Sequence, residues 1–230
     1  DGLKWGTHTR LDEADERLED MHKAGCIYIG FGAETASASM LERMGKGGFM
    51  LRPRGIKTNQ LTHIDGFDFP TTMVNGIRNC KDVGIHANCT WIMAYPGETL
   101  QDLQTSVAFI LWQQRLATEG LMPGSAEYDT AWHSINRRMF VATAYPGTEM
   151  FKDPACRELL TKHFGISYEP NGEPVVDDAL RSYVIELDDA TKVLHGVDGQ
   201  PINYGAMPMD EFLQAREHVN NNQIEKILTM

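Results

Sequence analysis

Residues of the kind that bind small charged molecules stand at the ends of predicted strands. Arg10 and Glu34 each follow a run that predicts a strand, and Thr90 lies within a third such run. Because the carboxyl ends of parallel strands meet at one edge of a sheet, these side chains would come together there. A cation, a carboxylate and a hydroxyl suit a small polar ligand with amine and carboxylate or phosphate groups. Simpler roles are also open, since Glu34 could cap a helix and Arg10 could form a surface ion pair.

The same four-residue turn sequence follows two separate predicted strands. Residues 94–97 and residues 144–147 both read Ala-Tyr-Pro-Gly, and each turn precedes a predicted helix. Such a turn brings the free backbone N–H groups of the helix to the end of the strand, where anions bind. Each turn could simply reverse the chain, but the occurrence of the pair after two separate strands is less easily dismissed. Glu98 is more simply a partner of its helix dipole than a catalytic acid.

Apolar runs that alternate with amphipathic segments predict the elements that position these residues. The chain contains four strand-then-helix units, which imply a parallel sheet with right-handed crossovers, either open or part of a barrel. The predicted strands are residues 3–9, 26–31, 85–93 and 138–143, and the predicted helices are residues 12–24, 37–44, 71–83, 100–116 and 149–164.

Other segments lack this alternation. Residues 46–70 predict a long loop that contains a short basic segment, and residues 119–134 predict a second irregular stretch. Beyond residue 165 one more strand is expected over 181–187, followed by a loop and a helix that begins at Asp210. We therefore expect a domain over residues 1–165 and a C-terminal appendage over residues 166–230.

The composition narrows the class of partner. The chain has 230 residues, and its 32 acidic and 21 basic side chains give a formal net charge of −11. A surface this acidic argues against general nucleic-acid binding, because phosphate affinity comes from clustered Lys and Arg. No apolar run is long enough to span a bilayer, and the first ten residues do not resemble a signal peptide. A small-molecule substrate and a cytoplasmic setting are expected, with no nucleic-acid or membrane partner.

The cysteines and histidines, which often bind metals or act in covalent catalysis, are not spaced as in known sites. Four scattered cysteines include no zinc-ribbon, redox or cluster-binding spacing, and the eight histidines show no metal-ligand spacing. Neither a phosphate-binding loop nor a nucleophile elbow is present. No metal ligand is therefore predicted, and no catalytic residue can be assigned from the sequence.

Five motifs in order resemble the radical S-adenosylmethionine (SAM) superfamily, in particular the branch that often carries an N-terminal cobalamin-binding domain. They are a strand ending in Arg10, Gly-Phe-Gly-Ala-Glu-Thr at 30–35, Leu-Glu-Arg-Met-Gly-Lys-Gly at 41–47, Tyr-Pro-Gly-Glu-Thr at 95–99 and Ala-Tyr-Pro-Gly-Thr at 144–148. The resemblance covers residues 3–151. It implies strands three to six of a partial, TIM-like (β/α)6 barrel that holds SAM and a [4Fe–4S] cluster at the strand ends, with cobalamin as a further cofactor in some relatives.

The resemblance also implies roles for individual residues. Arg10 would face the methionine part of SAM, Glu34 the ribose or the amino-acid part, Lys46 the SAM carboxylate, and Thr90 the ribose. Backbone contacts to adenine would come from the two turns, at Ala94, Tyr95, Pro96, Gly97, Tyr145 and Pro146. The family usually has Gly in place of Ala94, which makes the approach slightly tighter here.

One departure from the family pattern is large. The Cys-x-x-x-Cys-x-x-Cys loop and the Gly-Gly-Glu segment that precede these motifs in the family are not in the sequence. The chain is therefore expected to be a fragment of a radical SAM enzyme that does not turn over alone, because without thiolates no cluster supplies the electron that cleaves SAM. An incomplete sheet would also expose an edge, for which a homodimer is expected.

Two other functions remain open. One is a cluster-independent βα-barrel lyase or isomerase, with Glu34 as general base and Lys46 or Arg10 for anion binding. The other is a non-catalytic binding domain.

Overall fold

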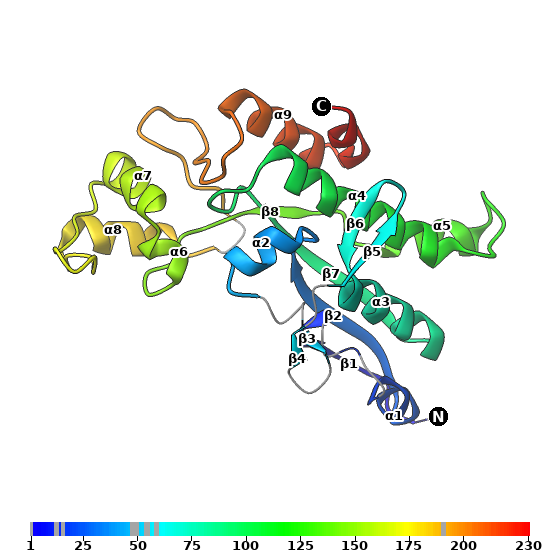
Figure 1. Cartoon of the computed structure of the whole chain (residues 1–230). Coiled ribbons are helices and arrows are strands. Elements are labelled where there is room, and N and C mark those ends of the chain that lie inside the picture. The colour runs from blue at the N-terminus through cyan, green and yellow to red at the C-terminus, as the bar shows by residue number, and fades with distance from the viewer. Residues whose placement is uncertain are drawn as a thin grey trace. The chain divides into compact units, whose positions relative to one another are not determined.

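The largest sheet in the described residues has four strands, and helices lie between these strands along the chain (Figure 1). The computed structural model describes residues 2–11, 14, 17–46, 51–52, 56–57, 60–189 and 192–230. The sheet has the order β1-β2-β7-β8. Its strands are β1 (Trp5–Thr9), β2 (Cys26–Glu34), β7 (His86–Met93) and β8 (Met139–Val141). The pairs β1–β2 and β2–β7 are parallel, which confirms the predicted α/β class of parallel βα units and fits part of a TIM-like barrel.

The chain divides into two compact units that are interleaved along the sequence. Unit 1 comprises residues 1–91, 100–139 and 213–230, and unit 2 comprises residues 92–99 and 140–212. These two compact units differ from the two domains that were expected to meet at residue 165. That boundary was drawn where the strand-helix alternation weakens, and it stays a prediction.

Side chains on β7 alternate between the two faces of the sheet. Ala87, Cys89 and Trp91 are buried, whereas Asn88 is half-buried and Thr90 is exposed. The buried face is covered by aromatic side chains that include Phe109 and Trp112 of α4 (Leu100–Thr118), whose ring centroids lie 5.0 Å apart. Apolar burial on one face leaves the other face to carry polar groups.

Most of the remaining helices follow the predicted spans. These are α1 (Arg17–Lys23), α2 (Ala38–Arg43), α3 (Thr71–Val83), α6 (Glu149–Lys152), α7 (Pro154–Phe164) and α9 (Met209–Asn220), which precedes a 3-10 helix, η3 (Ile224–Thr229). The expected cap at Asp12 lies outside the described residues. Pro154 separates α6 from α7, and the Asp153 side chain accepts hydrogen bonds from two backbone N–H groups at the start of α7.

The expected loop over residues 46–70 contains strands instead. Two short strands, β3 (Leu51–Arg52) and β4 (Ile56–Lys57), pair antiparallel, as do β5 (Leu61–Ile64) and β6 (Phe67–Pro70). Asp65 and Gly66 join β5 to β6 with φ values of 52° and 86°. An Asp-Gly pair in this conformation is a strong hairpin signal, so the composition of residues 46–70 was a poorer guide than this one dipeptide.

Two further expectations are wrong. The stretch over residues 119–134 contains α5 (Ala126–Ser134), which begins where the Ser125 hydroxyl accepts a hydrogen bond from Tyr128 N at 3.1 Å. The strand expected over residues 181–187 is a helix, α8 (Asp178–Glu186), and the Asp177 carboxylate caps it by accepting from Leu180 N at 3.0 Å. In both cases an N-capping side chain decided the local structure. None of the helices in the described ranges is long and apolar enough to cross a membrane.

Candidate functional site

An ion pair stands at the carboxyl end of β2 in unit 1. Lys46 Nζ donates to Glu34 Oε1 at 2.7 Å, and the two side chains keep exposed fractions of 33% and 16%. The Ser37 hydroxyl accepts from Met40 N and begins α2, and this short helix carries the chain round to Lys46. The pair is therefore shielded enough to be well defined, yet open enough for a charged ligand to reach it.

The backbone at Glu34 is unusual. Glu34 has a φ of 65°, a left-handed conformation that costs a residue with a side chain roughly 1–2 kcal/mol. The register of β2 against β7 also shifts between Gly32 and Glu34. This irregularity turns the carboxylate back over Gly32, where an added Cβ would lie 3.0 Å from Glu34 Oε1 and 3.9 Å from Lys46 Nζ. Gly32 thus leaves room for the ion pair above the sheet.

The other polar residues predicted for this edge are less closely joined. The exposed residue Thr90 is the register partner of Gly32 on the neighbouring strand, and its hydroxyl donates to Phe31 O at 3.4 Å. Arg10 lies exposed just after β1. The structure therefore brings Glu34 and Lys46 together and sets Thr90 beside them, whereas the role of Arg10 stays a prediction.

Unit 2 contains both Pro-Gly turns. Glu98 N donates to Tyr95 O at 2.9 Å across the first turn, and Thr148 N donates to Tyr145 O at 3.1 Å across the second. Gly97 and Gly147 have φ values of 82° and 86°, as the third position of a type II turn requires. Because Ala142 N donates to Met93 O at 2.8 Å, the strand segments that lead into the two turns are paired within this unit.

The first turn is held by a buried carboxylate. Glu98 is fully buried and its Oε2 accepts the N–H of Ala94, which has a left-handed φ of 60°. On the other side of this segment, Ala206 N donates to Glu98 O at 2.8 Å. Gly205 approaches closely, since an added Cβ there would lie 3.3 Å from the Ala94 Cα. This geometry gives Glu98 a structural role in the turn.

The second turn is held by a residue that the sequence did not single out. Tyr183 of α8 is 1% exposed, and its hydroxyl donates to Ala144 O at 2.6 Å. Treating residues 181–187 as a strand hid this contact. The signal that could have found it is the cap at Asp177, which starts a helix with Leu180 and Tyr183 on one face.

The cysteines do not form a metal site in the described part of the chain. All four are free and buried, and no three His, Cys, Asp or Glu side chains in the described ranges gather as a metal would need. Burial, and secondarily the nearby Cys26, raise the pKa of the Cys80 thiol to about 12. Burial also raises the pKa of Cys89. Thiols in this state are poor ligands and poor nucleophiles.

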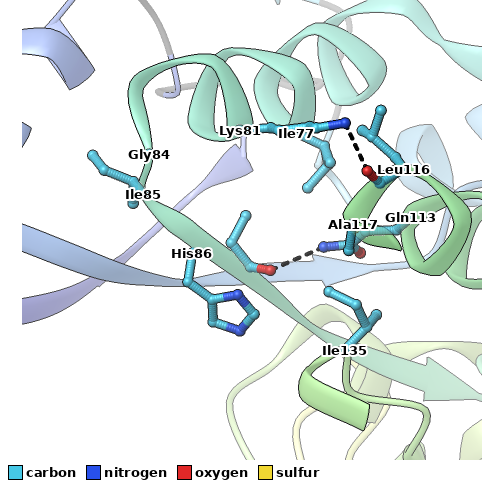
Figure 2. A pocket seen from close by; sticks show the side chains of 10 residues that line it. Ile77, Lys81, Gly84, Ile85, His86, Gln113, Leu116, Ala117 and Ile135 are labelled. Atoms are coloured by element: carbon cyan, nitrogen blue, oxygen red, sulfur yellow. Dashed lines mark hydrogen bonds between the residues drawn. The ribbon is translucent and has the colours of Figure 1, made fainter. Parts of the chain in front are cut away.

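A separate hollow lies at the amino end of β7 in unit 1 (Figure 2). It encloses about 290 Å³ and is lined mainly by apolar side chains such as Ile77 and Leu116. Gln113 Nε2 donates to Ala87 O at 3.0 Å and Lys81 Nζ to Leu116 O at 2.8 Å, while the His86 ring points away from both donors. Gln113 thus joins α4 to β7 and Lys81 joins α3 to α4, so both polar groups have a structural role in this hollow.

Comparison with known proteins found a curated relative that matches part of the chain. No protein-family model matches the chain. An uncharacterized methyltransferase from Pyrococcus horikoshii is 24% identical over 159 residues, which cover 69% of this chain and 26% of that protein. The chain therefore spans about a quarter of the length of this relative.

Two solved structures also match part of the chain. TsrM from Kitasatospora setae, described as a radical SAM methyltransferase with cobalamin and a [4Fe–4S] cluster bound, matches with a TM-score of 0.43 and 17% identity, over 78% of this chain and 28% of that one. Elp3 from Methanocaldococcus infernus matches with a TM-score of 0.42 and 12% identity, over 96% of this chain and 42% of that one.

Proposed function

We propose that this chain forms the SAM-binding edge of a radical SAM protein, and that the intact protein cleaves SAM reductively for radical chemistry on a small substrate. The ion pair between Glu34 and Lys46 carries the proposal. A free amino acid is a zwitterion, and a carboxylate beside an ammonium can bind its two charged groups at once. The methionine part of SAM would therefore insert between these side chains, its ammonium on Glu34 and its carboxylate on Lys46.

The residues present fit this part of SAM. Gly32 leaves a space beside Oε1 of Glu34 that any Cβ would fill, and Thr90 offers a hydroxyl on the adjacent strand. Glu34 also keeps a left-handed backbone that a glycine would adopt without strain. A strained residue that persists at the end of a strand favours a role for its side chain. Within unit 2, the Ala-Tyr-Pro-Gly turns would by themselves contact an adenosine group through their backbone groups.

The residues of this chain do not fit a [4Fe–4S] cluster. Its thiols are buried and scattered over different elements, and the described residues hold no ligand set. We therefore assign no step through a cluster to this chain. In the proposal, cluster ligands come from outside these 230 residues, and cobalamin is a further group that these residues do not specify.

Methyl transfer is the reaction class that we favour for the intact protein. The curated relative is named a methyltransferase, and SAM bound in this orientation supplies an activated methyl group or a source of radicals. The residues of this chain would bind SAM, orient it and exclude water around it.

A binding measurement on the chain as it stands tests the proposal. We expect SAM and L-methionine to bind, and Glu34→Gln to weaken both about tenfold, because one charge-assisted hydrogen bond is lost. Binding of 5′-methylthioadenosine, which lacks the amino-acid part, should change little. NMR titration at millimolar ligand concentration can detect all three.

A second ion pair offers a matched control. Lys81 Nζ lies 2.6 Å from Glu119 Oε2 near the hollow of Figure 2, so Glu119→Gln removes the same charge from a similar pair. It should leave the affinity for SAM unchanged. The proposal fails if SAM does not bind to the unaltered chain, or if Glu119→Gln and Glu34→Gln have equal effects.

A further inference from the structure

The Tyr183 hydroxyl has a specific partner that packing alone does not require. The ring of Tyr183 lies against Phe164 and Phe151, with centroids 4.9 and 6.0 Å away, in a buried apolar cluster of unit 2. A phenylalanine would make the same contacts. The hydroxyl adds the 2.6 Å hydrogen bond to Ala144 O, and it also interacts with the buried Tyr204 side chain.

That carbonyl immediately precedes the second turn. The hydrogen bonds within the turn join Tyr145 O to the backbone N–H and the hydroxyl of Thr148, so they fix residues 145–148 but not the peptide between Ala144 and Tyr145. A trans peptide is planar, and its C=O and N–H point in opposite directions. Holding Ala144 O therefore also sets the direction of the Tyr145 N–H.

A nearby tyrosine in the same cluster lacks such a partner. Tyr168 packs on Phe151 at 5.9 Å, and its buried hydroxyl has no hydrogen-bond partner among the described residues. Burial raises the pKa of Tyr168 to about 12, and burial also raises the pKa of Tyr183, so both hydroxyls stay protonated. The two residues differ in whether the hydroxyl reaches the turn.

We propose that Tyr183 is a positioning residue for the adenosine part of SAM, and that it acts by fixing the peptide between Ala144 and Tyr145. This inference rests on the proposed function. It gives the segment after residue 165 a part in adenosine binding within unit 2, because α8 contacts the second turn of the same unit. Tyr183 itself need not touch the ligand, since the peptide that it orients makes the contact.

The test separates the two parts of SAM. Tyr183→Phe should weaken binding of SAM and of 5′-methylthioadenosine about tenfold, the factor expected for one buried hydrogen bond, and leave L-methionine binding unchanged. Tyr168→Phe removes a hydroxyl from the same cluster and should change neither affinity. A general loss of structure would weaken methionine binding as well, and a disruption confined to unit 2 would shift amide resonances throughout that unit. The split identifies positioning when the rest of the spectrum stays unchanged.

The outcomes distinguish this inference from the function on which it rests. If the unaltered chain binds neither SAM nor its fragments, the proposed function fails and the inference falls with it. If SAM binds and depends on Glu34, but Tyr183→Phe leaves 5′-methylthioadenosine binding unchanged or alters both fragments equally, only the inference is overturned. The Tyr145 amide resonance should also shift in Tyr183→Phe and not in Tyr168→Phe, and an unshifted resonance would contradict the proposed contact.

Discussion

The Lys46 ammonium lies 2.7 Å from the Glu34 carboxylate. Both charged groups lie above Gly32, which belongs to β2 like Glu34. Twelve residues separate the two side chains along the sequence, and helix α2 closes this distance. The pair is formed within one βα unit, so its geometry depends on the local turn after β2. It is the arrangement from which the proposed methionine site is built.

The left-handed backbone of Glu34 predicts a conflict between stability and binding. Glu34→Gly should raise the free energy of unfolding by about 1 kcal/mol, because glycine adopts a φ of 65° without strain. The same variant should lose the affinity for methionine. Urea unfolding and NMR titration measure the two effects. Glu34→Gln serves as the control, since it retains the strain, and equal stability of the two variants would contradict the prediction.

For Ala94, a substitution by glycine should raise stability without a loss of affinity. Its φ of 60° favours glycine, so Ala94→Gly should also stabilise the chain by about 1 kcal/mol. Here the affinity for SAM should be retained or improved, because only backbone groups of this turn are expected to contact the ligand. A loss of affinity on this substitution would mean that the Ala94 methyl group itself contributes to binding.

The buried thiols predict a loss of stability in alkaline solution. The pKa of Cys80 is raised from 9.0 to about 12 in the folded chain, so between these pH values the unfolded chain releases a proton that the folded chain keeps. The contribution is fully present below pH 9 and is lost as the pH rises toward 12. Unfolding free energies measured from pH 8 to pH 11 should fall, and Cys80→Ala should make the fall less steep. An identical slope in the variant would count against this.

The edge of the sheet predicts self-association. In the described part of the chain β1 has a partner on one side only, which leaves backbone donors and acceptors along the other side. We propose that two copies pair through this edge. Light scattering should then give a mass that rises with concentration toward a dimer. His8→Pro, which removes one donor from the free side of β1, should shift that rise to higher concentration, and a monomer at all concentrations would exclude the pairing.

The sequence by itself was enough for the repeating βα units and for the glycine-ended helices, because both depend on local periodicity and backbone conformation. It also pointed to Glu34 and to the two Pro-Gly turns, since these stand where apolar runs end. The hairpin and the two helices were mispredicted because the composition of these segments outweighed local signals. These signals are the Asp65-Gly66 pair and the N-caps at Ser125 and Asp177.

Only the tertiary structure decided which polar groups meet. The contact of Lys46 with Glu34 depends on how α2 returns the chain, and the contact of Tyr183 with Ala144 joins residues 39 positions apart. Such pairings are set by packing of whole elements, which no short stretch of sequence records. Glu98 shows the same limit, because its role in holding Ala94 became visible only once the turn and its burial were known.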